Sequence, residues 1–409
     1  MLTGWSVMND NPAVVLGMYE TGLGVGRSLA RNGIQVIGID YKNDMGFYSR
    51  YIDARSCPHP LKESGLFLEF MVSLSREYTR MPVLFMTSDD FVLAVSRMRK
   101  DLSRYYLFNL PPENLVEGII DKRMQYERAR KTGVLIPQTF YPRSLRELHT
   151  IKNTIPYPCF IKGCFSYTWK EHFGARKGFV VKDEKTLFET FTMVFDKKLP
   201  VMIQEIIVGP DTNHFKFCCY ISQRGELLLS FMLQKIRQQP IHFGVGAIVE
   251  SIHYPELFKI GKQFFTRLGY RGVGSAEFKL DARDNKLKLI ELNPRYWQQN
   301  ALADICGMNF PLTDYLEATG KNPHPKNGYR NGMKWMNIYM NFQSFLGYYR
   351  KKQLTLAQWL KSFKHVRVLS DFAWDDIGPF FYESHNGLLA LKMPLYIIRN
   401  TLLHFKTNI

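Results

Sequence analysis

Two neighbouring segments decide the fold: residues 274–281 read GSAEFKLD, and residues 286–293 read KLKLIELN. Each segment alternates apolar with polar side chains, a pattern typical of a β-strand that buries one face. The tetrapeptide between them, ARDN at 282–285, is polar and predicts a turn. Together the three pieces predict an antiparallel hairpin.

The hairpin carries a cluster of oxygen ligands. If its turn centres on Asp284, Glu277 faces Glu291 across the two strands, and Asn293 follows on the same face two residues later. Facing carboxylates repel each other, so they suit a hard cation, and Mg²⁺ takes one or two carboxylates together with phosphate and water. Mn²⁺ is an alternative metal. The competing interpretation is a solvated hairpin face whose register is shifted by one residue.

Residues 13–100 predict a first lobe with a parallel sheet. Short apolar runs at 13–17, 35–40 and 82–86 alternate with helical segments. Strands that are separated by helices form parallel sheets with right-handed crossovers. We therefore expect a Rossmann-like lobe at residues 1–110.

A glycine run in this lobe invites a dinucleotide-binding interpretation. Gly22, Gly24 and Gly26 form a turn that precedes a helix at 23–31, and Asp40 ends the second strand. However, the third glycine of the G-x-G-x-x-G fingerprint falls on Arg27. A Rossmann-like lobe that binds no dinucleotide is therefore favoured.

The order of five motifs further along resembles the ATP-grasp superfamily. The resemblance covers roughly residues 10–320 and is strongest to the carboxylate–amine ligase branch, which includes D-aspartate ligase-like and carbamoyl-phosphate-synthase-like proteins. The motifs are Asp121-Lys122, Phe160-Ile161-Lys162, the segment 204–209 (QEIIVG), Glu277, and the segment 291–295 (ELNPR). The resemblance implies α/β and α+β architecture: the Rossmann-like pre-ATP-grasp lobe, then a two-lobed ATP-grasp domain at 111–325 with its hinge near 204–209, and a basic, aromatic-rich C-terminal extension at 326–409.

The resemblance also implies roles for named residues. Lys122 and Lys162 match two phosphate-binding lysines, and Lys177 matches a lysine in a loop that is bulkier here than in many family members. Gln204, Glu205, Ile206 and Ile207 match the linker that reads and covers adenine, and Asp211 or Glu205 would contact the ribose. Glu277, Glu291 and Asn293 would bind metal.

Three basic residues form an expected clamp over the phosphoryl group. Lys235 and Arg237 lie two residues apart on one strand, so both can face the cleft, and Arg295 adjoins the metal motif. Positioned cations stabilise the charge that spreads over a transferring phosphoryl group. The alternative for the strand is a solvated basic face.

Composition limits the function classes. The chain has 409 residues and a net charge of +17, without zinc-finger, RNP or basic-zipper patterns, so we expect no nucleic-acid partner. No uncharged apolar run approaches the ~18 residues that span a bilayer, and the N-terminus lacks a signal pattern. We expect a cytoplasmic protein.

The segment 326–409 carries a net charge of +8, and 387–405 interleaves apolar with basic residues. This pattern predicts either a docked helix or peripheral contact with the inner face of a membrane.

The resulting expectation is an ATP- and Mg²⁺-dependent ligase that joins a small carboxylate to an amine through an acyl phosphate, with homodimerisation common in the family. One alternative is an ATP-binding module of the same fold with little or no turnover. The other is a nicotinamide-dependent oxidoreductase, for which the glycine run is the only support.

Overall fold

A parallel sheet forms the first lobe of the computed structural model, which describes residues 11–174 and 176–387. Its strand order is β3-β2-β1-β4. The strands are β1 (Ala13–Leu16), β2 (Val36–Asp40), β3 (Asp53–Ser56) and β4 (Val83–Met86). The helices are α1 (Glu20–Arg31), α2 (Ser64–Ser75), α3 (Asp89–Arg97) and α4 (Arg99–Leu102), with the short η1 (Met45–Tyr48). Successive residues of β1 enter two different apolar clusters, because helices cover both faces of the sheet. The predicted Rossmann-like lobe is confirmed.

The glycine run lies inside helix α1, which begins at Glu20 and not after a glycine-rich turn. A Cβ atom at Gly22 would lie 1.8 Å from the backbone oxygen of Gly17, so this position serves close packing of the helix on the preceding loop. The side chain of Arg27 is buried, and its Nε lies 2.8 Å from Asp376 Oδ2. The residue that breaks the dinucleotide fingerprint thus anchors the C-terminal segment to the first lobe.

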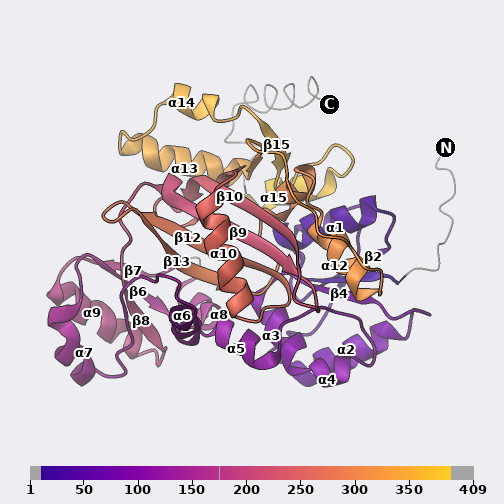
Figure 1. Ribbon diagram of the computed structural model, residues 1–409, viewed down its shortest axis with the longest axis horizontal. Helices are drawn as coiled ribbons and strands as arrows, with labels where there is room; N and C mark the ends of the chain where they lie inside the picture. The colour runs from indigo at the N-terminus through magenta and orange to yellow at the C-terminus, as the bar shows by residue number, and fades with distance from the viewer. Residues whose placement is uncertain (1–10, 175, 388–409) are drawn as a thin grey trace.

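A small antiparallel sheet with the order β5-β8-β6-β7 forms the second lobe. Its strands are β5 (Thr139–Phe140), β6 (Cys159–Gly163), β7 (Phe179–Val181) and β8 (Val201–Glu205). Its helices are α7 (Leu145–Ile151), α8 (Ser166–Phe173) and α9 (Glu184–Phe195), with η2 (Lys152–Thr154). Helix α9 begins with a capping box, in which Asp183 accepts a hydrogen bond from the backbone of Thr186. In Figure 1 this lobe lies at the lower left.

The third lobe is a seven-stranded sheet with the order β13-β12-β9-β10-β11-β14-β15. Its strands are β9 (His214–Ile221), β10 (Leu227–Gln239), β11 (Val245–Ser251), β12 (Gly272–Asp281), β13 (Lys286–Asn293), β14 (Lys334–Met336) and β15 (Val366–Leu369). The remaining helices are α5 (Glu113–Ile120), α6 (Lys122–Lys131), α10 (Pro255–Arg267), α11 (Asn300–Ile305), α12 (Phe310–Ala318), α13 (Ile338–Arg350), α14 (Leu356–Lys361) and α15 (Gly378–Gly387), with η3 (Asp211–Asn213).

The segment after residue 326 is built into the third lobe. Strand β14 pairs with β11, and β15 extends the sheet beyond it, while α13 packs against β10. In Figure 1, α13 and α14 lie along the upper edge of the sheet. The described part of the predicted extension therefore completes the large sheet instead of hanging from it. Residues 388–409, where most of the amphipathic pattern falls, lie outside the described residues.

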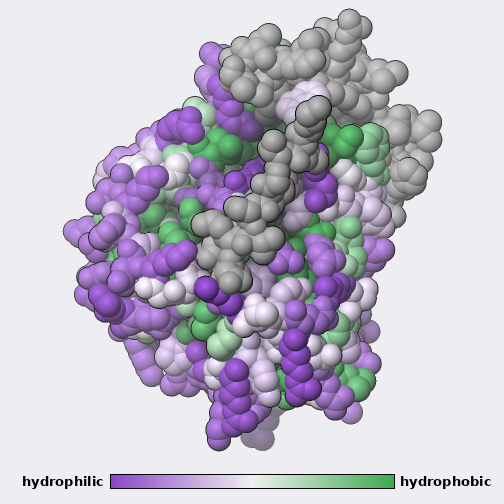
Figure 2. Space-filling model, turned by 90° about the vertical axis from the view of Figure 1, so that its right-hand side faces the viewer, coloured by the Kyte–Doolittle hydropathy of each residue, from purple (hydrophilic) through white to green (hydrophobic). Residues whose placement is uncertain are grey.

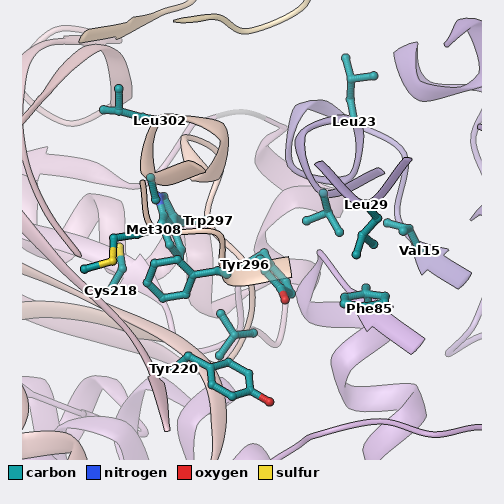
Figure 3. Close-up of a cluster of buried hydrophobic side chains, with 14 of the residues drawn as sticks. Val15, Leu23, Leu29, Phe85, Cys218, Tyr220, Tyr296, Trp297, Leu302 and Met308 are labelled. Atoms are coloured by element: carbon teal, nitrogen blue, oxygen red, sulfur yellow. The ribbon is translucent and has the colours of Figure 1, made fainter. Parts of the chain in front are cut away.

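One apolar cluster joins the first lobe to the large sheet, as Figure 3 shows. Val15 and Phe85 contribute from the parallel sheet, Cys218 from β9, and Tyr296 and Trp297 from the segment after β13. All five are at most 1% exposed, and a shared core of this kind fixes the relative position of two lobes.

The surface that Figure 2 shows is largely hydrophilic, with small apolar patches. In the described part of the chain, no helix is long and apolar enough to cross a membrane.

Candidate functional site

The hairpin of β12 and β13 places Glu277 directly opposite Glu291, as the sequence predicted. The turn alone does not produce this register. Next to the turn Asp281 pairs with Lys286, and if the same register continued without a break, Glu277 would lie opposite Ile290. An irregularity between Glu277 and Phe278 inserts the extra residue. A β-bulge of this kind re-aims side chains, and here it brings the two carboxylates together.

Lysines neutralise both carboxylates. Glu277 Oε1 lies 3.1 Å from Lys216 Nζ, and Glu277 Oε2 lies 3.0 Å from Lys235 Nζ. Glu291 Oε1 lies 2.9 Å from Lys122 Nζ. Burial by itself raises the pKa of both glutamates, but the adjacent ammonium groups outweigh it and hold each pKa well below its ordinary value. Both side chains are therefore ionised at neutral pH.

Three predicted phosphate-binding lysines face the same cavity, which lies between the small sheet and the large sheet: Lys122 at the start of α6, Lys162 on β6, and Lys177 after α8. Burial lowers the pKa of Lys162 to about 7, and the charges of Lys122 and Lys177 contribute to this shift. Burial opposes the charge of Lys122, but Glu291 outweighs it and raises that pKa. A crowded set of ammonium groups is suited to a polyanion, which would restore their charge.

The predicted adenine linker also borders the cavity, since Gln204, Glu205, Ile206 and Ile207 all line it. The carboxylate of Glu205 is already engaged: it accepts a hydrogen bond from the backbone of Gln138 at 2.8 Å and pairs with Arg283.

Two aromatic side chains of the cavity wall stack on each other. Phe160 of β6 stacks on Phe243 of the loop after β10, with ring centroids 4.9 Å apart and an angle of 8° between the planes. Both residues line the cavity.

Asp211 does not line the cavity. Its carboxylate accepts hydrogen bonds from the backbone N–H of His242 at 3.0 Å and from the hydroxyl of Tyr348 on α13. Asp211 thus connects the C-terminal helix α13 with the loop that carries Phe243. The prediction that it contacts the ribose has no geometric support here, because its acceptor oxygens point to protein donors.

The prediction that Lys235 and Arg237 face the same cleft is wrong. The pairing of β10 with β11 is irregular on both sides of Arg237, which turns this side chain away from Lys235. Arg237 Nη2 donates to Asn341 Oδ1 at 2.8 Å and to Ser362 Oγ at 2.6 Å, so it binds the C-terminal segment. Lys235 remains in the cavity.

Arg295 and Asn293 lie at the edge of the cluster. Arg295 Nε is 2.5 Å from Asp89 Oδ1 at the start of α3, and its Nη2 is 3.4 Å from Asn293 Oδ1. Burial opposes the charge of Arg295, but Asp89 outweighs it and raises the pKa. This pair connects the metal motif to the Rossmann-like lobe. Neither Arg295 nor Asn293 borders the cavity.

Several residues of the site escaped the sequence analysis. Among them are Lys216 on β9, which holds Glu277, and His214 and Lys279, which line the cavity. His214 and Lys279 are cross-strand partners on β9 and β12. Burial lowers the pKa of His214 well below its ordinary value, so the imidazole is neutral. The available signal was weak: a single lysine in the otherwise apolar run FKFCCYI at 215–221.

The donor set fits Mg²⁺. In the residues that the structure describes, no three His, Cys, Asp or Glu side chains gather as a ready-made metal site. Mg²⁺ needs only one or two carboxylates, because phosphate and water fill its remaining positions. Glu277 and Glu291, with ionised oxygens on one face of the hairpin, supply these two carboxylates.

Comparison with solved structures identifies the fold. The biotin carboxylase domain of Hydrogenobacter thermophilus 2-oxoglutarate carboxylase, in complex with MgADP, ADP and bicarbonate, superposes with a TM-score of 0.63 at 17% identity, covering 79% of this chain and 73% of that one. The N5-carboxyaminoimidazole synthetase of Staphylococcus aureus, in complex with ADP, gives a TM-score of 0.62 at 13% identity, covering 79% and 80%. The chain has the ATP-grasp fold.

A relative is also found among curated sequences. The chain is 19% identical to the D-aspartate ligase of Enterococcus faecium (strain Aus0004) over 379 residues, which cover 88% of this chain and 87% of that protein. No protein-family model matches the chain. The resemblance that the five motifs indicated is thus confirmed, and the cavity between the small and large sheets is the cleft between the two ATP-grasp lobes.

Proposed function

We propose that the chain is an ATP- and Mg²⁺-dependent ligase that joins a carboxylate to an amine through an acyl phosphate. The observation that carries the proposal is the pair Glu277 and Glu291, which face each other beside converging lysines in the cleft between the two lobes. The ligase and carboxylase names of the relatives support it.

The residues of the cleft have separate tasks. Lys122, Lys162 and Lys177 neutralise the phosphates of ATP, and Ile206 and Ile207 cover the base. Glu277 and Glu291 would hold Mg²⁺, with Asn293 beside them, and the bound metal would neutralise phosphate charge. Lys235, held by Glu277, places a further cation near the transferring group.

The proposed reaction needs no general base for its first step, because a carboxylate is ionised at pH 7. A carboxylate oxygen attacks the γ-phosphorus, a new P–O bond forms, and the bond to ADP breaks. The amine then attacks the acyl carbon: a C–N bond forms, the C–O bond to phosphate breaks, and the surplus proton of the amine passes to solvent. The products are an amide, ADP and phosphate.

Phosphate release across a panel of carboxylates and amines tests the proposal, with D-aspartate tried first, both as the carboxylate and as the amine, because of the curated relative. We expect release that requires Mg²⁺, a carboxylate and an amine, and that is lost in Glu291→Gln. MgADP binding without release by any pair would favour the binding module. A thermal shift with NAD(P)H but not with MgADP would favour the oxidoreductase, although Arg27 fills the place of its third glycine.

We also propose a peripheral position for the protein at an anionic membrane face. Residues 318–370 contain ten Lys and Arg residues and no Asp or Glu. At the α13–α14 corner, Tyr349, Leu356 and Leu360 are 56%, 52% and 47% exposed, next to exposed Lys351 and Lys352. Exposed apolar groups that are ringed by lysines suit an interface with anionic lipid.

Sedimentation with phosphatidylcholine vesicles, with and without phosphatidylglycerol, tests the membrane contact. We expect binding only to the anionic vesicles, with losses in Lys351→Gln/Lys352→Gln but not in the control Lys197→Gln/Lys198→Gln on the small lobe. Binding that is equal in both variants would remove the proposal.

A homodimer is the further assembly that we propose, since the Hydrogenobacter domain is a dimer. Light scattering during gel filtration measures it.

A further inference from the structure

A short loop reaches across the cleft at the place where the purine of ATP is expected. It is the turn between β10 and β11, residues 240–244, and we call it the cleft loop. Three of its residues, His242, Phe243 and Gly244, line the cavity. Phe243 stacks on Phe160, which belongs to the small sheet. The stack therefore connects the two lobes that form the cleft.

This stack and a bound purine exclude each other. Phe160 lies two residues before Lys162 on β6 and lines the same cavity as Ile206 and Ile207 of the adenine linker. The centroids of the Phe160 and Phe243 rings are only 4.9 Å apart, and the ring planes are almost parallel. A base between two rings needs about 7 Å, because atoms in contact stay roughly 3.5–4.0 Å apart. A purine can therefore stack on Phe160 only after Phe243 has moved away.

The backbone of the cleft loop is strained where the loop is anchored. His242 has a φ of 71°, in the left-handed region that is unfavourable for residues other than glycine. Its backbone N–H donates to Asp211 Oδ2 at 3.0 Å, and its Nδ1 lies 3.4 Å from Asp211 Oδ1. A strained conformation persists only when the surrounding contacts hold it. Asp211 is thus the anchor of the loop.

Helix α13 of the C-terminal segment supports this anchor. The Tyr348 hydroxyl donates to Asp211, and the Tyr348 ring meets the His242 ring edge-on, with centroids 5.7 Å apart. At Gly347 an added Cβ atom would lie 3.1 Å from Ile241 Cγ2, so the helix packs directly on the loop. Figure 1 shows α13 along the upper edge of the large sheet, and it packs against β10. The C-terminal segment is thereby connected to the wall of the nucleotide cleft.

Other contacts hold α13 in place independently of Tyr348. Arg237 on β10 donates to Asn341 of α13, which is 0% exposed, and to Ser362 after α14. Phe345 of α13 stacks on Trp359 of α14, with ring centroids 4.7 Å apart. Removal of the Tyr348 hydroxyl should therefore loosen the loop without displacing the helix.

We propose that the cleft loop is an autoinhibitory latch, and that Tyr348 is a positioning residue that keeps it closed through Asp211. The inference rests on the proposed nucleotide site. In the closed state Phe243 covers Phe160, and in the open state this ring face is left to the purine. Only open molecules bind the nucleotide, so the apparent affinity is reduced in proportion to the open fraction. A weaker anchor raises the open fraction and with it the affinity.

Calorimetry of MgADP binding to the full chain tests the latch. Tyr348→Phe keeps the ring and removes a hydroxyl that donates to a charged acceptor, so the affinity for MgADP should rise about two- to fivefold. The control Tyr339→Phe changes a tyrosine at the opposite end of α13 and should leave the affinity unaltered. A variant that merely damaged the fold would bind more weakly, so the direction of the change separates the two explanations.

A double variant and the binding rates give further readouts. Tyr348→Phe combined with Phe243→Ala should bind no more tightly than Phe243→Ala alone, because no ring is left to hold over Phe160. In stopped-flow measurements the gain of Tyr348→Phe should lie in the association rate, with the dissociation rate unchanged, because the latch acts only on the ligand-free protein.

The outcomes separate the latch from the proposed function. Unchanged or weaker MgADP binding in Tyr348→Phe would overturn the latch while the nucleotide site stands, and so would gains that multiply in the double variant. Binding by the variants but not by the parent would support a latch that is almost fully closed. Absence of MgADP binding in the parent and in every variant would reject the nucleotide site, and the latch with it.

Discussion

Nucleotide binding should be coupled to the uptake of a proton by Lys162. In the ligand-free protein, burial and two neighbouring ammonium groups lower its pKa from 10.5 to about 7. Phosphate oxygens would replace repulsion by attraction and move the pKa back toward its ordinary value. At pH 8.5 roughly one in thirty ligand-free molecules carries the charge, whereas almost all of the complexes should carry it.

The sign follows from linkage. A ligand that raises a pKa binds more weakly as the pH rises from the lower to the higher value. The affinity for MgADP should therefore fall by up to tenfold per pH unit above about pH 7.5, and binding at pH 8.5 should take up close to one proton. The phosphates of ADP are fully ionised at this pH and add nothing.

Calorimetry at pH 8.5 in two buffers of different ionisation enthalpy, such as Tris and HEPPS, measures the proton directly. Lys162→Met should bind more weakly and lose most of the uptake, whereas Lys182→Met, an exposed lysine of the small lobe, should match the parent. Proton release, or uptake that survives in Lys162→Met, would refute the assignment of Lys162 as a phosphate ligand.

Three further substitutions test individual contacts. Glu277→Gln leaves two buried lysines without their partner, so it should lower the free energy of unfolding by about 3 kcal/mol in urea titrations. It should also abolish phosphate release. Unchanged stability would contradict the two ion pairs. Arg27→Leu should cost a similar ~3 kcal/mol by removing the guanidinium from the buried Asp376, which keeps only its hydrogen bonds from Ser49 and Arg50. The double variant with Asp376→Leu should recover part of this loss, and additive losses would show that the pair is not coupled. Phe243 occupies the ring face of Phe160, and a purine that stacks there must displace it. Phe243→Ala frees this face, so the affinity for MgADP, measured by calorimetry, should rise about two- to tenfold. Weaker binding would show instead that Phe243 holds the nucleotide.

Local patterns in the sequence were enough to predict the lobes and most of the cleft. Alternation along 274–293 predicts the hairpin, the helix-separated apolar runs predict the parallel sheet, and the motif order predicts ATP-grasp lobes. The first two signals depend on residues close together in the chain, where strand and helix periodicity fixes which side chains share a face. The third is a resemblance to known sequences, carried by motifs that span residues 121–295.

Other features depended on residues far apart in the sequence. The bulge that sets Glu277 opposite Glu291, and the irregular pairing that turns Arg237 toward α13, are departures from regular pairing that local alternation does not encode. Asp211 is held by Tyr348, which lies 137 residues away.

The sequence by itself therefore determined the fold class and the chemical kind of the site, because apolar periodicity and carboxylate and lysine chemistry are properties of short segments. Tertiary structure decided which of these groups meet. Lys216 against Glu277 and Arg27 against Asp376 are contacts between different strands or lobes. The free energy of burying a charge or an amide depends on the partner that folding brings to it, and linear spacing does not specify that partner.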